Sequence, residues 1–147
     1  MCYAVYLGTD QKLNTSKWDE KSPAFYVEEV VDKDEVSVKQ HFSKSNIYYV
    51  GSHEGCGCGF AYDDEDLDIN DDEDVADNES RKESVVRFNN LLEQIFRNTN
   101  ELEVFLCWEG DQGLQPEKSD VVTKEYFNNG DWVEDKPTFY KVIKNER

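Results

Sequence analysis

Apolar residues recur at helical spacing between residues 80 and 98, in a segment flanked by two stretches with strand character. The apolar positions are Val85, Phe88, Leu92, Ile95 and Phe96. Steps of three or four residues place such side chains on one face of a helix, and Ser80 with Glu83 matches a capping box at its start. Because an amphipathic helix buries its stripe against another layer, the sequence predicts a helix over about 80–98 packed on one face of a sheet.

Strand signals occur on both sides of this helix. Alternating or continuous apolar residues, with many Val, Tyr and Phe, mark the segments 2–7, 24–31, 47–50, 101–108 and 138–143. Residues 34–42 indicate a short helix, and residues 121–127 a short strand or a turn of helix. We therefore predict an α+β fold with a mainly antiparallel, mixed sheet of about five strands. A length of 147 residues fits a single domain over 1–147.

The connection between the strands at 47–50 and 101–108 is long and contains the predicted helix. A parallel pair of strands requires such a connection. If the first strand lies between these two and antiparallel to both, its start and their ends share one edge of the sheet. Cys2, the loop over 53–58 and the residues 107–111 would then lie together. Trp108, Glu109 and Asp111 could border a pocket there, or form an edge tryptophan followed by a turn.

The segment 51–60 is rich in Cys and Gly and contains His53, Cys56 and Cys58 in the pattern H-x-x-C-x-C. Imidazole and thiolate are ligands that suit zinc and other thiophilic metals. The intervening glycines give the backbone freedom to wrap both sulfur atoms around one ion. The sequence therefore predicts a candidate zinc site formed by His53, Cys56 and Cys58, with Cys2, Cys107 or water in the fourth position.

Two other interpretations of this loop stay open. Cys56 or Cys58 could be a reactive thiol of an enzyme or redox sensor, with His53 as the base and Glu54 or Asp111 orienting it. Such a thiol needs a lowered pKa. Alternatively, the cysteines serve as small apolar core residues, and the glycines mark a place where the backbone passes tightly beneath another element.

The charge of the chain is concentrated in one tract. The formal net charge is −17, and eleven acidic residues without any Lys or Arg lie between Asp63 and Glu79, leaving about −6 elsewhere. With almost nothing apolar to bury, residues 62–79 are expected to form a mobile acidic loop. A structural or interaction protein that uses this loop to contact a basic partner is therefore a third functional class.

Part of the acidic tract has the spacing of a calcium-binding EF-hand loop. The matching residues are Asp68, Asn70, Asp72, Asp74 and Glu79. Glu73 stands where that loop needs a glycine, and no amphipathic helix precedes the match. We therefore favour a solvated loop over a calcium site.

Composition also argues against several partners. No Lys/Arg cluster is present, which disfavours nucleic acid and anionic membrane surfaces. No apolar run approaches the ~20 residues of a membrane span, and residues 2–8 lack the features of a signal peptide. We expect a cytoplasmic protein with reduced cysteines. The expected function is a small binding protein for a metal, a small ligand or a protein partner, with the Cys/His loop as its site.

Overall fold

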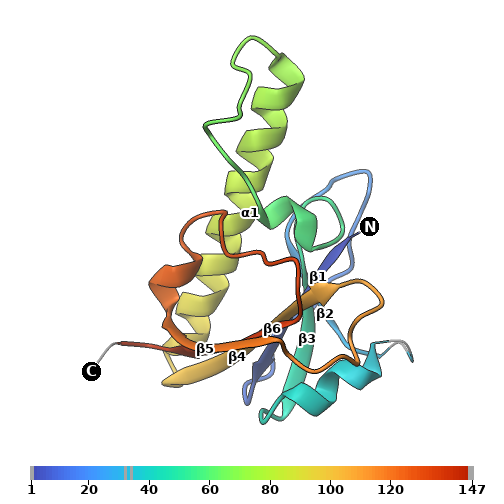
Figure 1. The fold of residues 1–147 in the computed structure, drawn as a ribbon, viewed down its shortest axis with the longest axis vertical. Helices are drawn as coiled ribbons and strands as arrows, with labels where there is room; N and C mark the ends of the chain where they lie inside the picture. Colours follow the sequence, from blue (N-terminus) through green and yellow to red (C-terminus); the bar gives the residue numbers. More distant parts are fainter. Residues whose placement is uncertain (1, 32, 34, 146–147) are drawn as a thin grey trace.

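A computed structural model describes residues 2–31, 33 and 35–145 of the chain. Its elements, in chain order, are β1 (Tyr3–Thr9), β2 (Tyr26–Glu29), the 3-10 helix η1 (Val36–His41), β3 (Asn46–Gly51), the 3-10 helix η2 (Gly57–Phe60), α1 (Asp72–Phe96), β4 (Glu101–Trp108), β5 (Lys118–Thr123), the 3-10 helix η3 (Lys124–Phe127) and β6 (Thr138–Ile143). Figure 1 shows one sheet with the long helix α1 lying against it. The predicted α+β fold is confirmed.

The sheet has six strands in the order β2-β3-β1-β4-β6-β5. Strand β1 pairs antiparallel with both β3 and β4, which is the condition on which the expected meeting of Cys2 with the loop over 53–58 depended. Strands β5 and β6 form a parallel pair, which makes the sheet mixed. The start of β1 and the ends of β3 and β4 therefore meet at one edge, where the glycine- and cysteine-rich loop leaves β3.

Both faces of the sheet are covered. On one face, Val5 and Leu7 of β1 belong to the same buried cluster as the apolar stripe of α1. On the other face, Ala4 and Tyr6 pack with Val38 of η1. Successive side chains of a strand point to opposite faces of the sheet, which accounts for this division. Burying each large apolar side chain contributes about 1.5–3 kcal/mol to stability.

Helix α1 is longer than its apolar stripe predicted. It begins at Asp72, eight residues before Ser80, because the Asp71 carboxylate accepts hydrogen bonds from the backbone N–H groups of Glu73 and Asp74. Acidic residues also fill the first turn, where the positive end of the helix dipole favours them. Residues 72–79 of the expected acidic loop are thus helical, whereas mobility of the residues before Asp72 stays a prediction.

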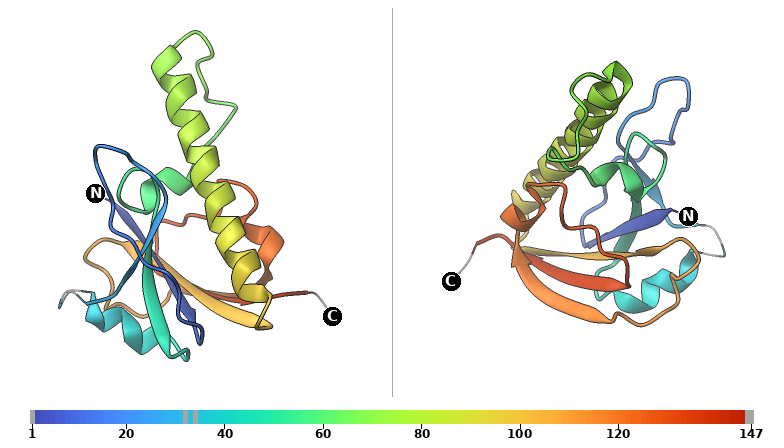
Figure 2. Two further views of the ribbon diagram at one scale, coloured as in Figure 1. Left: turned by 180° about the vertical axis from the view of Figure 1, so that it is seen from behind. Right: turned by 45° about the horizontal axis from the view of Figure 1, so that its top comes forward.

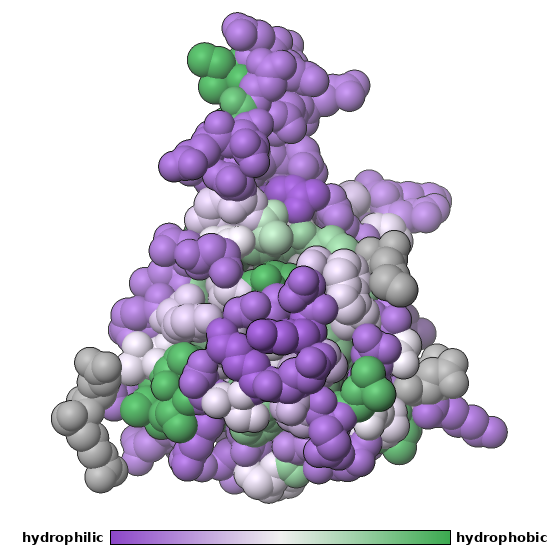
Figure 3. Space-filling model, in the orientation of Figure 1, coloured by the Kyte–Doolittle hydropathy of each residue, from purple (hydrophilic) through white to green (hydrophobic). Residues whose placement is uncertain are grey.

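This early part of α1 extends away from the sheet (Figure 2). The projecting end is covered mostly by hydrophilic residues (Figure 3). We refer to residues 63–79, which comprise this part and the chain leading to it, as the acidic arm. It carries few apolar side chains, so its helical turns are stabilised by capping and charge more than by core packing.

The remaining predicted segments are close to the observed ones. Strands β4 and β6 have the expected bounds, and residues 118–127 form a strand followed by a 3-10 turn. The short helix expected over 34–42 is η1, although residue 34 lies outside the described part of the chain. Within the described residues, no helix combines the length and apolar character needed to cross a membrane.

Candidate metal centre

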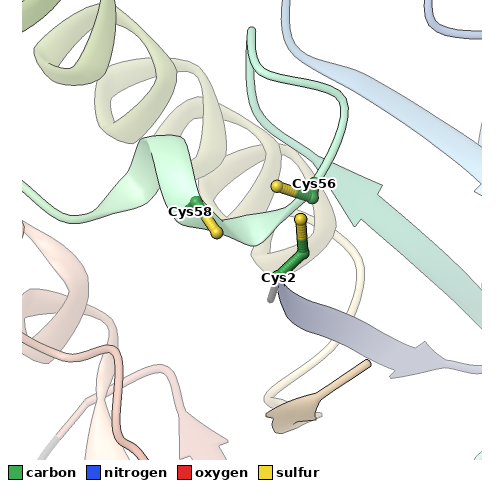
Figure 4. A group of neighbouring side chains, drawn as sticks. All are labelled: Cys2, Cys56 and Cys58. Atoms are coloured by element: carbon green, nitrogen blue, oxygen red, sulfur yellow. The ribbon is translucent and has the colours of Figure 1, made fainter. Parts of the chain in front are cut away.

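Three cysteines meet at the edge where β1 starts. The sulfur atoms of Cys2, Cys56 and Cys58 all lie within 4.8 Å of one another, and Figure 4 shows them gathered between β1 and η2. Cys2 immediately precedes β1, Cys56 is the N-cap of η2, and Cys58 lies within η2. Cys2 therefore lies beside the loop over 53–58, as expected for this edge of the sheet. The sequence had suggested it as one of several candidates for the fourth ligand.

Backbone hydrogen bonds attach the cysteine cluster to β1 and to the residue that follows β4. The backbone N–H of Tyr3 donates a hydrogen bond to Cys58 Sγ at 3.3 Å. The carbonyl of Cys2 accepts one at 2.7 Å from the N–H of Glu109, just beyond β4. Cys2 is exposed, Cys58 is half-buried and Cys56 is buried, so the cluster has one side open to solvent.

His53 and Cys107 lie outside this cluster. His53 instead groups with Glu54 and Asp77, and its Nδ1 lies 3.0 Å from Ser84 Oγ of α1. Cys107 pairs with Ala4 across β1 and β4 and belongs to the buried cluster on the face of the sheet that α1 does not cover. The structure thus brings Cys56 and Cys58 together with Cys2 and directs His53 towards the helix.

The group formed by His53, Glu54 and Asp77 lies beside a positively charged side chain. Arg81 of α1 pairs with Glu54 at 2.9 Å and with Asp77 at 2.7 Å. His53 Nε2 lies 3.6 Å from Asp77 Oδ1 and is buried without a hydrogen-bond partner among the described residues. Because Arg81 already neutralises both carboxylates, this group forms an ion-pair network in preference to a metal site.

Ser52 organises the loop that carries Cys56 and Cys58. Its buried hydroxyl donates to the Cys56 carbonyl at 2.6 Å and accepts from the N–H of Gly59 at 3.1 Å. A Cβ at Gly59 would lie 2.3 Å from Ser52 Oγ, and Gly55 has a φ of +84°. The glycines are therefore required by close approach and by a left-handed turn, as the interpretation of tight backbone passage anticipated.

Two side chains from distant segments clamp the same loop. Arg81 Nη1 donates to the carbonyls of Cys58 and Ala61, both at 2.8 Å. On the other side, Trp18 Nε1 donates to the His53 carbonyl at 3.0 Å. The sequence did not identify Ser52 or Arg81 as functional, since neither carries a local signal beyond the position of Arg81 two residues after the acidic arm.

Replacing Ser52 with alanine should lower the free energy of unfolding by about 1–3 kcal/mol, because it leaves the buried N–H of Gly59 without an acceptor. Urea denaturation measures this change. Ser80→Ala is the matched control: Ser80 lies inside α1 instead of capping it, so its loss should change stability by about 0.5 kcal/mol or less. Equal effects of the two substitutions would contradict this account of the loop.

The thiols of Cys56 and Cys107 are held in the neutral form. Burial, with the neighbouring thiols of Cys58 and Cys2, raises the pKa of Cys56 to about 12. Burial beside Glu109 and Asp111 likewise raises the pKa of Cys107 to about 12. An activated nucleophile requires the opposite shift. A coordinated metal ion reverses the effect of burial, because a coordinating thiol is deprotonated outright.

The calcium-like spacing in the acidic arm does not form a loop. Helix α1 begins at Asp72, the fifth position of that spacing. Asp72, Asp74 and Glu79 therefore lie along a helix and cannot wrap around one ion as an EF-hand loop does.

A pocket lies near the cysteine cluster. It has a volume of about 610 Å³ and is lined in part by Tyr26, Tyr49, Glu109 and Gly110. The hydroxyl of Tyr49 donates to Glu109 at 3.1 Å, and that of Tyr26 donates to the Gly55 carbonyl at 2.7 Å. Glu109 thus borders a pocket, as one interpretation expected, whereas Trp108 stacks on Tyr3.

Comparisons of this chain with protein-family models, with curated proteins and with solved structures gave no match.

Proposed function

We propose that this chain is a metal-binding domain that holds a thiophilic ion, with zinc the best candidate, through Cys2, Cys56 and Cys58. The observation that carries the proposal is the mutual approach of the three sulfur atoms within 4.8 Å. They come from two segments far apart in the sequence. Thiolates are soft ligands that favour zinc and cuprous copper over calcium or magnesium.

A bound ion would keep one coordination position for a further ligand. Among the described His, Cys, Asp and Glu residues, none adds a fourth ligand atom to the three sulfurs. Zinc sites with three protein ligands commonly bind water or a small molecule in the fourth position. The exposure of Cys2 places that position within reach of solvent.

Metal binding accounts for the site better than thiol catalysis does. The raised pKa of Cys56 opposes formation of a free thiolate at neutral pH. Among the described residues, His53 makes no hydrogen bond with a cysteine, since its Nδ1 contacts Ser84. A base that would activate Cys56 is therefore missing from the geometry.

The test is a zinc titration of reduced, metal-free protein against a competing chromogenic chelator. We expect one equivalent to bind. Structural zinc in small peptides contributes about 10–16 kcal/mol, so the loss of one of its ligands removes roughly 3 kcal/mol. Serine at position 2, 56 or 58 should accordingly weaken binding by about 100-fold.

Two control substitutions distinguish the alternative ligand sets. His53→Ala and Cys107→Ala should leave the zinc affinity within about threefold of the unmodified chain, since neither residue belongs to the cluster. If His53→Ala weakened zinc binding as much as Cys56→Ser while Cys2→Ser did not, the site would be His53, Cys56 and Cys58. Absence of zinc binding to the reduced chain would refute the proposal.

A further inference from the structure

The three cysteines of the cluster differ in their access to solvent. Cys2 is exposed, whereas Cys58 is half-buried and only 7% of Cys56 is exposed. An oxidant that reaches the cluster therefore meets Cys2 first, with two shielded thiols directly behind it. This is the arrangement of an accessible thiol beside a resolving thiol that redox-sensitive cysteines use.

Contacts within the cluster distinguish the two shielded thiols. The three sulfur atoms lie within 4.8 Å of one another, and Figure 4 shows the sulfur of Cys2 pointing towards Cys56. The sulfur of Cys58 instead accepts the N–H of Tyr3. A disulfide between Cys56 and Cys58 would close a very small ring and would be strained. Cys56 is thus the best-placed partner for Cys2.

We infer that Cys2 and Cys56 are a modification site, at which a hydroperoxide converts the two thiols into a reversible disulfide that prevents metal binding. The bond would link the start of β1 to the N-terminus of η2. Its effect on the metal rests on the proposed function, whereas formation of the bond does not.

The disulfide forms in two steps. The Cys2 sulfur attacks one peroxide oxygen, the O–O bond breaks, and Cys2 becomes a sulfenic acid while one water (or alcohol) leaves. The Cys56 sulfur then attacks the Cys2 sulfur, an S–S bond forms, the S–O bond breaks, and a second water leaves with the proton from Cys56. Two thiols lose two electrons to one peroxide, and a dithiol reductant reverses the change.

The disulfide would disable the site because the ligand form of cysteine is the thiolate. Only Cys58 of the three would keep a free thiol. One remaining thiolate cannot replace three, so oxidation and metal occupancy exclude one another.

The experiment treats the full chain with one equivalent of hydrogen peroxide, with and without zinc, and maps its disulfides by mass spectrometry without reduction. We expect a peptide pair joined through Cys2 and Cys56, two hydrogen atoms lighter than the free peptides. In zinc-loaded protein, a chromogenic chelator should detect one zinc released for each bond formed. A bond between Cys2 and Cys58, or sulfinic acid at Cys2 without any bond, would overturn the inference.

Two variants keep this inference separate from the proposed function. Cys58→Ser should lose zinc affinity yet still form the bond between Cys2 and Cys56. Cys56→Ser should accumulate sulfenic acid at Cys2, which dimedone traps. Bond formation in a chain that binds no zinc would refute only the proposed metal function, whereas zinc binding by a chain that forms no bond would refute only this inference.

Discussion

Truncation of Trp132 to alanine is expected to lower the free energy of unfolding by about 3–5 kcal/mol, the usual cost of removing a large buried aromatic side chain. Only 1% of Trp132 is exposed. Its ring stacks on that of Phe88 of α1, with a distance of 5.2 Å between the ring centroids. The ring centroids of Phe60 of η2 and Phe127 of η3 lie 5.5 Å and 5.1 Å from that of Trp132. The resulting cavity would open between the helix and the element that carries Cys58.

The indole N–H supplies a matched control for this substitution. Trp132 Nε1 is buried without a hydrogen-bond partner among the described residues. Trp132→Phe removes that unpaired donor while keeping an aromatic ring, so it should cost less than about 1.5 kcal/mol. Urea unfolding followed by circular dichroism measures both variants. Equal losses for alanine and phenylalanine would show that the stacked ring is not what stabilises this part of the core.

Because Phe60 belongs to η2, Trp132→Ala should also loosen the cysteine cluster. Domains of this size have about 5–15 kcal/mol of total stability, so a loss of 3–5 kcal/mol is a large share of it. We therefore expect weaker zinc binding in this variant, even though Trp132 offers no ligand atom.

Alkylation of Cys56 by iodoacetamide at neutral pH should be at least about 30-fold slower in the folded, metal-free protein than in the chain unfolded in urea. Raising the pKa from the ordinary 9.0 to about 12 lowers the thiolate fraction roughly 1000-fold. The greater nucleophilicity of a more basic thiolate restores about 30-fold of this. Limited access to a buried sulfur slows the reaction further.

The pH dependence of this alkylation follows from the direction of the shift. Because the pKa of Cys56 lies far above neutrality, its thiolate fraction, and with it the rate, should increase about tenfold for each pH unit between pH 7 and 9. Time-resolved peptide mapping measures the rates at each cysteine. Cys107, whose pKa is raised by burial in the same way, should also react slowly, and exposed Cys2 should react first. Rapid labelling of Cys56 at neutral pH would favour a reactive thiol over a metal ligand.

Most of the fold follows from local patterns. The strand at 101–108 alternates because its two faces contact different layers, and its observed bounds match its pattern. The parallel direction of β3 and β4 follows from a general rule of connection, since a long helical crossover joins parallel strands. The placement of β1 between them was only a condition at the sequence level, and the pairing of the strands establishes it. The start of α1 could not be predicted from such a pattern. The apolar stripe indicates only the part of a helix that is buried, and the first two turns of α1 are not buried in the core.

The candidate site was less predictable than the fold. The C-x-C spacing identified Cys56 and Cys58 because their separation is local. His53, three residues before Cys56, was grouped with them because spacing alone does not give the direction of a side chain in an irregular loop. That direction depends on Ser84 and Asp77 of α1, which contact the His53 ring from a distant part of the sequence.

By itself, the sequence determined the fold class, the central position of the first strand and the location of the candidate site in the loop after β3. These depend on apolar periodicity, glycine placement and connection length, which are local or topological properties. Only the tertiary structure decided which side chains complete the cluster. Cys2 joins Cys56 and Cys58 because β1 pairs with both β3 and β4, and His53 is drawn away by an ion-pair network on the helix. Contacts of this kind arise from long-range packing, which a linear pattern does not record.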